Sequence, residues 1–169
     1  MMQQEFVTWL LPSARRQIDL TPEFLIAQAA LESGWGEHII GRYNMFGITR
    51  GNGYDGPVLL VATTEYHSSP SVAYQKPEKV LQVTALIGGH YRYRVKRLFR
   101  DYGSLDECLA DHKRVLMQPC FRHAWPYRHS AEDFVEQLQC GARKYATDPD
   151  YVNVMNRMIR QVRKLIADA

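Results

Sequence analysis

The most informative segment of this 169-residue chain is TPEFLIAQAALESG, residues Thr21–Gly34. Thr21 supplies a capping hydroxyl, Pro22 suits the first helical position, and Glu23 complements the positive end of the helix dipole. The apolar run that follows therefore predicts a helix through Glu32. Because glycine adopts the left-handed conformation that ends helices, we expect it to stop at Gly34 or Gly36.

The rest of the chain predicts helices at both ends and strands in the middle. Apolar periodicity and capping residues indicate helices at Glu5–Arg16, at Cys108–Met117 after the capping box that begins at Ser104, at Phe134–Cys140 after the one that begins at Ser130, and from Asp148-Pro149 onward. Alternating runs indicate a strand at Val58–Tyr66 and a hairpin of Val80–Ile87 and His90–Val95 around Gly88-Gly89.

These elements predict an α+β, mainly helical architecture with a small antiparallel β-lobe. The chain has no internal repeat and no linker, so we expect one domain over residues 1–169. Its helical lobe would comprise about residues 1–48 and 101–169, and its β-lobe about residues 49–100. A cleft between the two lobes is the natural place for an active site.

Composition and charge exclude several classes of function. The chain is 46% apolar and 23% charged, which is typical of a soluble globular protein. Its net charge of +3 is too small and too dispersed to predict nucleic-acid binding. No apolar run approaches the ~20 residues that a membrane span needs.

Cysteine usage predicts neither a disulfide framework nor a metal centre. The three cysteines are odd in number, which favours reduced and partly buried thiols. Two Cys–His pairs, Cys108 with His112 and Cys120 with His123, could each supply half of a zinc site, but neither has a matching second pair. Cys140 has no such partner nearby in the sequence.

Glu32 is the first candidate for chemistry. It shares one helical face with Leu25 and Ala29, so its carboxyl lies on an apolar stripe where desolvation raises a pKa. It also occupies the last helical turn, where the negative end of the dipole disfavours ionisation. A carboxyl that stays protonated near neutral pH is suited to general acid catalysis. The alternative is an ordinary glutamate near a helix end, solvated or paired with an arginine.

Glu65 is the second candidate, near the end of the predicted strand Val58–Tyr66. Strand glutamates usually face solvent, so this position alone indicates little. Two carboxyl groups on facing lobes would nevertheless match the arrangement that glycosidases use. Sequence does not give their separation and so leaves the stereochemistry open.

Four blocks of sequence occur in an order that is typical of one enzyme family. They are Ala27–Gly36 with Asn44–Ile48, then Thr63–Tyr66, Phe99–Tyr102 and Tyr145–Tyr151. Together they resemble glycoside hydrolase family 73, which includes the hydrolase domains of flagellar rod-assembly proteins and of phage lysins. The resemblance extends from about Leu20 to Ile166. It implies a lysozyme-like fold and an endo-β-N-acetylglucosaminidase that cuts peptidoglycan glycan strands after N-acetylglucosamine, without a metal or organic cofactor.

The resemblance also assigns roles to single residues. Glu32 matches the general acid, and Glu65 matches a second acidic residue that serves as base, water-positioning group or stabiliser. Tyr145 matches a tyrosine of the cleft that supports the reacting sugar. Substrate contacts are implied for Trp35, Asn44, Phe46, Gly47, Tyr66 and Tyr151. Core packing is the alternative for the aromatic residues among them.

One part of the chain departs from the flagellar members of the family. Between Tyr66 and Phe99 it is longer than those relatives lead us to expect, and Ser68–Lys79 belongs to the added length. This segment would extend the β-lobe. The position of Glu65 over the cleft is therefore left open, whereas the helix that carries Glu32 is unaffected.

Rival interpretations remain within and outside enzymes. A muramidase or lytic transglycosylase would cut the other glycosidic bond on a related fold. A wall-binding or assembly module without catalytic activity would need no proton donor.

The N-terminus has no basic leader, so we expect synthesis in the cytoplasm without a signal peptide. Action in the periplasm or on the cell wall would then require delivery by a holin or by a dedicated secretion or assembly apparatus.

Overall fold

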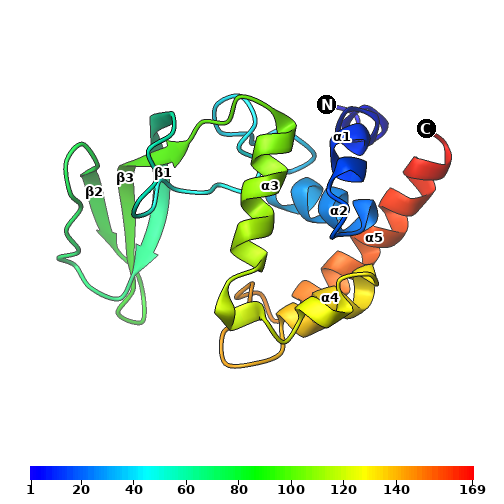
Figure 1. Ribbon diagram of the computed structural model, residues 1–169. Helices are drawn as coiled ribbons and strands as arrows, with labels where there is room; N and C mark the ends of the chain where they lie inside the picture. Colours follow the sequence, from blue (N-terminus) through cyan, green and yellow to red (C-terminus); the bar gives the residue numbers. More distant parts are fainter.

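The computed structural model describes residues 1–169 as a group of helices with a three-stranded sheet beside it (Figure 1). This arrangement confirms the predicted α+β, mainly helical class. The helices are α1 (Gln3–Arg16), α2 (Pro22–Ser33), α3 (Leu105–Leu116), α4 (Ala131–Leu138) and α5 (Tyr151–Ala167). The strands are β1 (Val58–His67), β2 (Lys79–Ala85) and β3 (Tyr91–Arg100). None of the helices is both long and apolar enough to cross a membrane.

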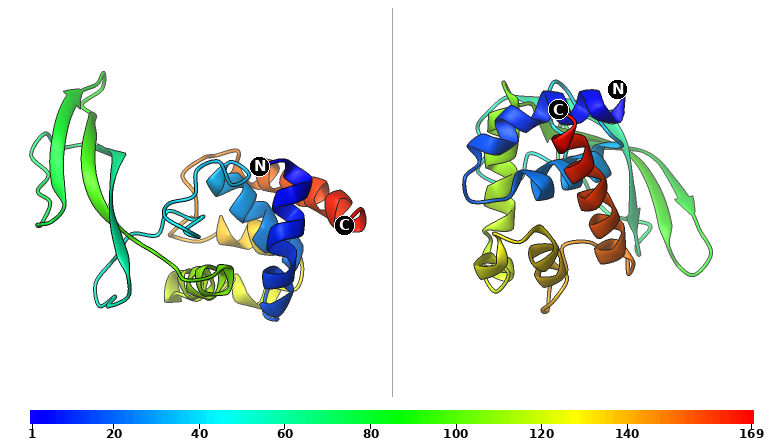
Figure 2. Two further views of the ribbon diagram at one scale, coloured as in Figure 1. Left: turned by 90° about the horizontal axis from the view of Figure 1, so that it is seen from above. Right: turned by 90° about the vertical axis from the view of Figure 1, so that its right-hand side faces the viewer.

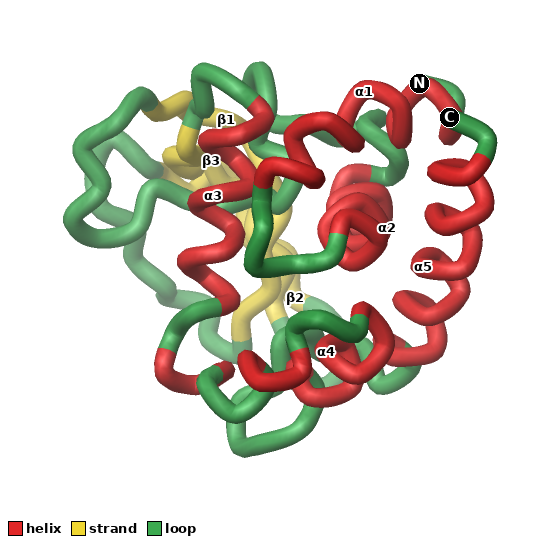
Figure 3. Tube along the Cα trace, turned by 45° about the vertical axis from the view of Figure 1, so that its right-hand side comes forward, coloured by secondary structure: helices red, strands yellow, loops and turns green.

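Helix α2 lies in the middle of the helical part, as Figure 3 shows, and α1, α4 and α5 pack against it. Every residue from Phe24 to Ala30 is buried, which is expected of a helix enclosed by others. Both predicted ends are confirmed. The Thr21 hydroxyl accepts a hydrogen bond from the backbone N–H of Phe24 at 3.3 Å. Gly34 follows the helix with φ +58°, a left-handed conformation that costs glycine little.

Several predicted boundaries shift by a few residues. Helices α3 and α4 begin directly after their capping residues, Ser104 and Ser130, and so start and end earlier than predicted. Helix α5 begins at Tyr151, not at Asp148-Pro149, because the Asp148 carboxylate accepts a hydrogen bond from the backbone N–H of Asp150 at 2.9 Å and forms a turn before the helix.

The sheet is antiparallel with strand order β1-β3-β2. The predicted hairpin turn is confirmed, with φ of +84° at Gly88 and +74° at Gly89. Strand β3 continues beyond the predicted Val95 to Arg100 because β1 pairs with it along its whole length. Figure 2 shows the sheet standing away from the helices. Leu60 and Leu81 on its strands and Ile87 in its hairpin turn remain exposed.

The added segment between β1 and β2 folds back onto one face of the sheet. The Tyr93 hydroxyl on β3 donates to the Ser69 carbonyl oxygen at 2.5 Å. The Tyr74 hydroxyl lies 2.7 Å from Nε2 of His67. Tyr93 is 1% exposed, so this segment gives the β-lobe a small core of its own.

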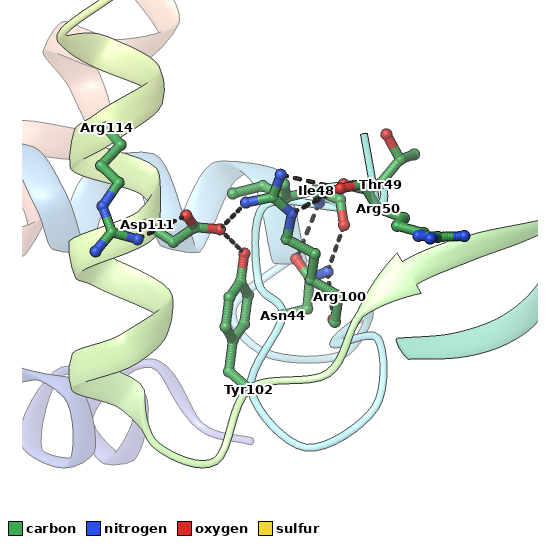
Figure 4. A network of polar contacts seen from close by, with 8 residues as sticks. All are labelled: Asn44, Ile48, Thr49, Arg50, Arg100, Tyr102, Asp111 and Arg114. Carbon is green, nitrogen blue, oxygen red and sulfur yellow. Dashed lines mark hydrogen bonds and ion pairs between the residues drawn. The ribbon is translucent and has the colours of Figure 1, made fainter. Parts of the chain in front are cut away.

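A buried ion-pair network lies where β3 continues into the helical part (Figure 4). Asp111 of α3 is 5% exposed and receives hydrogen bonds from Arg100 at 2.7 Å and from the Tyr102 hydroxyl at 2.5 Å. Arg114, on the exposed side of α3, lies 3.3 Å from the same carboxylate. The carboxylate therefore joins α3 to the end of β3.

The same arginine and a buried amide hold the loop before β1. The Arg100 guanidinium donates to the carbonyl oxygens of Thr49 and Arg50 at 3.0–3.2 Å. The Asn44 amide donates at 2.9 Å to the carbonyl oxygens of Ile48 and Arg100, and its oxygen accepts from the backbone N–H of Ile48 at 3.0 Å. These contacts fix the orientation of the β-lobe relative to α3.

All three cysteines are free thiols. Cys108 is buried, which raises the pKa of its thiol to about 12. Cys120 is partly buried, but Cys140 is exposed, which differs from the predicted partial burial.

Candidate active site

Glu32 lies in the last turn of α2, at an open pocket of about 530 Å³. Leu25 and Ala29 on the same helical face are both 0% exposed, so the apolar stripe reaches the surface at Glu32. The pocket is otherwise lined by Leu31 and by the segment before and at the start of α5, namely Tyr145, Ala146, Thr147, Asp148 and Tyr151.

The surroundings of Glu32 favour its protonated form. Solvent reaches the side chain through the open side of the pocket, but the protein around it displaces much of the water that would stabilise a carboxylate. Burial accordingly raises the pKa of Glu32. The predicted desolvation is thus confirmed, whereas the contribution of the helix dipole stays a prediction. No protein group forms a hydrogen bond or ion pair with this carboxyl that would lower its pKa again.

Two tyrosines stand beside Glu32. The rings of Tyr145 and Tyr151 have centroids 5.7 Å apart. Burial raises the pKa of both hydroxyls, and the negative charge of an ionised Glu32 raises them further. Both tyrosines therefore remain neutral and keep an O–H next to the carboxyl.

Asp148 is a second carboxylate in this pocket that sequence reasoning did not single out. Its Oδ1 accepts a hydrogen bond from the backbone N–H of Asp150, while its side chain remains exposed. The signal available in the sequence was its position between Tyr145 and Tyr151, inside the last family block.

A buried polar network lies behind the pocket. Gln28 and His112 are 0% and 1% exposed, and Oε1 of Gln28 lies 2.5 Å from Nε2 of His112. The Gln28 amide nitrogen donates to the Tyr151 hydroxyl at 2.8 Å. Phe46 is partly buried and stacks on His112 with ring centroids 3.6 Å apart and planes at 6°, and it is not among the residues that line the pocket.

Glu65 and Tyr66 lie on the sheet and do not line the pocket of Glu32. Glu65 forms an ion pair with Arg97 at 3.2 Å, and Arg97 lies 3.6 Å from Glu78 as well. Tyr66 is 65% exposed and points to the opposite face of β1. The structure thus places Glu65 in an ion-pair cluster of the β-lobe.

The other predicted contacts also lie outside this pocket. Trp35 follows α2 with φ +58°, and its ring packs edge-on against Phe6 with centroids 5.8 Å apart. The amide of Asn44 is fully buried and engaged in the loop contacts described above. Gly47 has φ +60° and open space where a side chain would begin. Their roles in substrate binding stay predictions.

Residues 10–164 match the family model of the glucosaminidases, which is described as mannosyl-glycoprotein endo-beta-N-acetylglucosaminidase. The chain belongs to this family. The resemblance to glycoside hydrolase family 73 is thereby confirmed. Over 158 residues the chain is 32% identical to the peptidoglycan hydrolase FlgJ of Escherichia coli K12, covering 90% of this chain and 43% of that protein. It is 30% identical to a probable N-acetylmuramidase of Lactococcus lactis subsp. cremoris, covering 94% of this chain and 33% of that protein. The chain thus spans less than half the length of these relatives.

Solved structures share the fold of this chain. The glycoside hydrolase domain of Salmonella typhimurium FlgJ aligns with a TM-score of 0.73 at 29% identity, covering 99% of this chain and 92% of that one. A peptidoglycan hydrolase mutant from Sphingomonas sp. A1 aligns with a TM-score of 0.70 at 28% identity, covering 98% of this chain and 99% of that one. The likeness covers both lobes and confirms the predicted lysozyme-like fold.

Proposed function

We propose that this glucosaminidase hydrolyses the glycan strands of peptidoglycan after N-acetylglucosamine, with Glu32 as the general acid. The observation that carries the proposal is a carboxyl with a raised pKa, free of ion pairs, at an open pocket beside two neutral tyrosines. Family membership and the relatives named as peptidoglycan hydrolases support the same activity and substrate.

In this proposal Glu32 gives its proton to the glycosidic oxygen as the bond to the leaving sugar breaks. A protonated carboxyl is required for that step, and desolvation in the pocket maintains it. Tyr145, which lines the same pocket, supports the reacting sugar. No step needs a metal or an organic cofactor.

Attack on the anomeric carbon follows one of two routes. Water is activated by a carboxylate, or the substrate's own 2-acetamido group attacks first and forms an oxazoline that water then opens. Glu65 is held by Arg97 on the sheet, so we assign it a supporting role. Asp148 is the other carboxylate of the pocket, and it is the candidate for positioning water in the first route.

A muramidase is the second candidate function, because one relative is named a probable N-acetylmuramidase. The two activities leave different reducing ends. Purified peptidoglycan is digested, the products are reduced with borohydride, and the muropeptides are analysed by mass spectrometry. We expect N-acetylglucosaminitol at the new ends. N-acetylmuramitol would identify a muramidase, anhydro ends a lytic transglycosylase, and the absence of soluble products a wall-binding module.

This activity places the protein's action at the bacterial cell wall, in the periplasm or on the wall itself. Delivery by a holin or by a dedicated secretion or assembly apparatus is part of the proposal. Comparing wall lysis from outside and from inside intact cells, with and without a co-expressed holin, tests it.

A further inference from the structure

The structure places the amide oxygen of Gln28 against His112 and its amide nitrogen against Tyr151. Oε1 of Gln28 has no proton, so Nε2 of His112 at 2.5 Å must be the donor. Burial lowers the pKa of His112 to about 3, and the ring is therefore neutral with its proton on Nε2. This orientation turns the amide nitrogen of Gln28 toward Tyr151, to which it donates at 2.8 Å.

Packing holds this orientation in place. Gln28 is 0% exposed within the central helix α2, and His112 is stacked against Phe46 with the two planes at 6°. Turning the amide over would require His112 to carry its proton on Nδ1, which forms no hydrogen bond with the protein, so that buried proton would be left without an acceptor. The stacked ring and the buried amide thus fix which group donates to Tyr151.

The Tyr151 hydroxyl accepts the proton of Gln28 and keeps its own proton. No oxygen or nitrogen of the protein accepts that proton within hydrogen-bonding distance, although Tyr151 is only 3% exposed. Tyr151 lines the pocket of Glu32, and that is the direction left for its O–H. A buried hydroxyl without an acceptor is costly, so a bound group that accepts its proton is favoured.

We infer that Gln28 and His112 are positioning residues that turn the Tyr151 hydroxyl into a hydrogen-bond donor to an oxygen of the sugar bound beside Glu32. Gln28 and His112 do not line the pocket, so they act only through Tyr151. The inference rests on the proposed function and names a donor of its sugar subsite.

Gln28→Glu tests the direction of the hydrogen bond and not merely its presence. A carboxylate at residue 28 still accepts from His112, but it also accepts the proton of Tyr151 and removes that donor from the pocket. We expect kcat on purified peptidoglycan to fall about tenfold or more, as when a hydrogen bond formed in the transition state is lost. Tyr151→Phe should cause the same loss. The double variant should be no slower than Tyr151→Phe, because both changes remove one donor.

Controls separate this result from general damage. Gln161→Glu makes the same substitution at a half-buried position of α5 that does not line the pocket, and it should keep the wild-type kcat. If Gln28→Glu does not fold, Gln28→Met removes the amide at similar length and should show the same non-additivity with Tyr151→Phe. A wild-type kcat in the Gln28 variant, or losses that multiply in the double variant, would overturn the inference while the wild-type enzyme remains active. An inactive wild-type protein would overturn the proposed function together with the inference.

Discussion

Among substitutions at the junction between the two lobes, we expect Asp111→Asn to cause the largest loss of folding stability. Asparagine keeps an oxygen for the Tyr102 hydroxyl but removes the charge that neutralises Arg100 at 2.7 Å. Removing one partner of a buried ion pair costs about 3–5 kcal/mol. The Arg100 side chain is 19% exposed and keeps its backbone carbonyl acceptors, so the expected loss lies at the lower end, about 3 kcal/mol.

Urea unfolding followed by tryptophan fluorescence and by circular dichroism measures this loss, and coincident transitions justify a two-state analysis. Arg114→Ala is the matched control. It removes a partner of the same carboxylate that is 77% exposed, and it should cost at most about 0.5 kcal/mol. If Asp111→Asn loses less than about 1 kcal/mol, the network does not hold the lobes together and the reasoning is refuted.

Three further predictions concern the pocket, the sheet and the thiols. Activity should fall as pH rises through the raised pKa of Glu32, because the acid form is lost, and a pH–rate profile that rises over that range would contradict the assignment. Glu65→Gln should reduce kcat less than Asp148→Asn, since only Asp148 lines the pocket, and the reverse order in parallel assays would restore Glu65 as the water-activating base. A thiol reagent should modify the exposed Cys140 in the native protein and reach Cys108 only on unfolding, as mass spectrometry of the labelled peptides would show.

Local signals in the sequence were sufficient for most of the elements and for the desolvation of Glu32. The caps at Thr21 and Gly34 predicted α2 to within a residue, and the apolar stripe through Leu25 and Ala29 predicted the desolvation of Glu32. These features depend on neighbours within one or two helical turns. Patterns of that range are visible without knowledge of the tertiary structure.

The polar networks could not be predicted because their partners are distant in sequence. Gln28 forms hydrogen bonds with His112 and Tyr151, which are 84 and 123 residues away in the sequence. In the sequence itself, Gln28 is only a single polar residue within an apolar run. The position of Glu65 relative to the pocket of Glu32 could not be predicted from local sequence patterns either. It depends on how far the lengthened β-lobe stands from the helices, and the contacts of Arg100 and Asn44 at the junction determine that orientation.

The turnover of Glu32→Gln on purified peptidoglycan is the direct measurement of the proposed chemistry. Glutamine keeps the shape of the side chain and removes the proton that is to be transferred. We expect a loss of at least ~10²-fold, the usual contribution of general acid catalysis, with an unchanged circular dichroism spectrum. Release of reduced muropeptides within a few-fold of the wild-type rate would remove Glu32 from the mechanism.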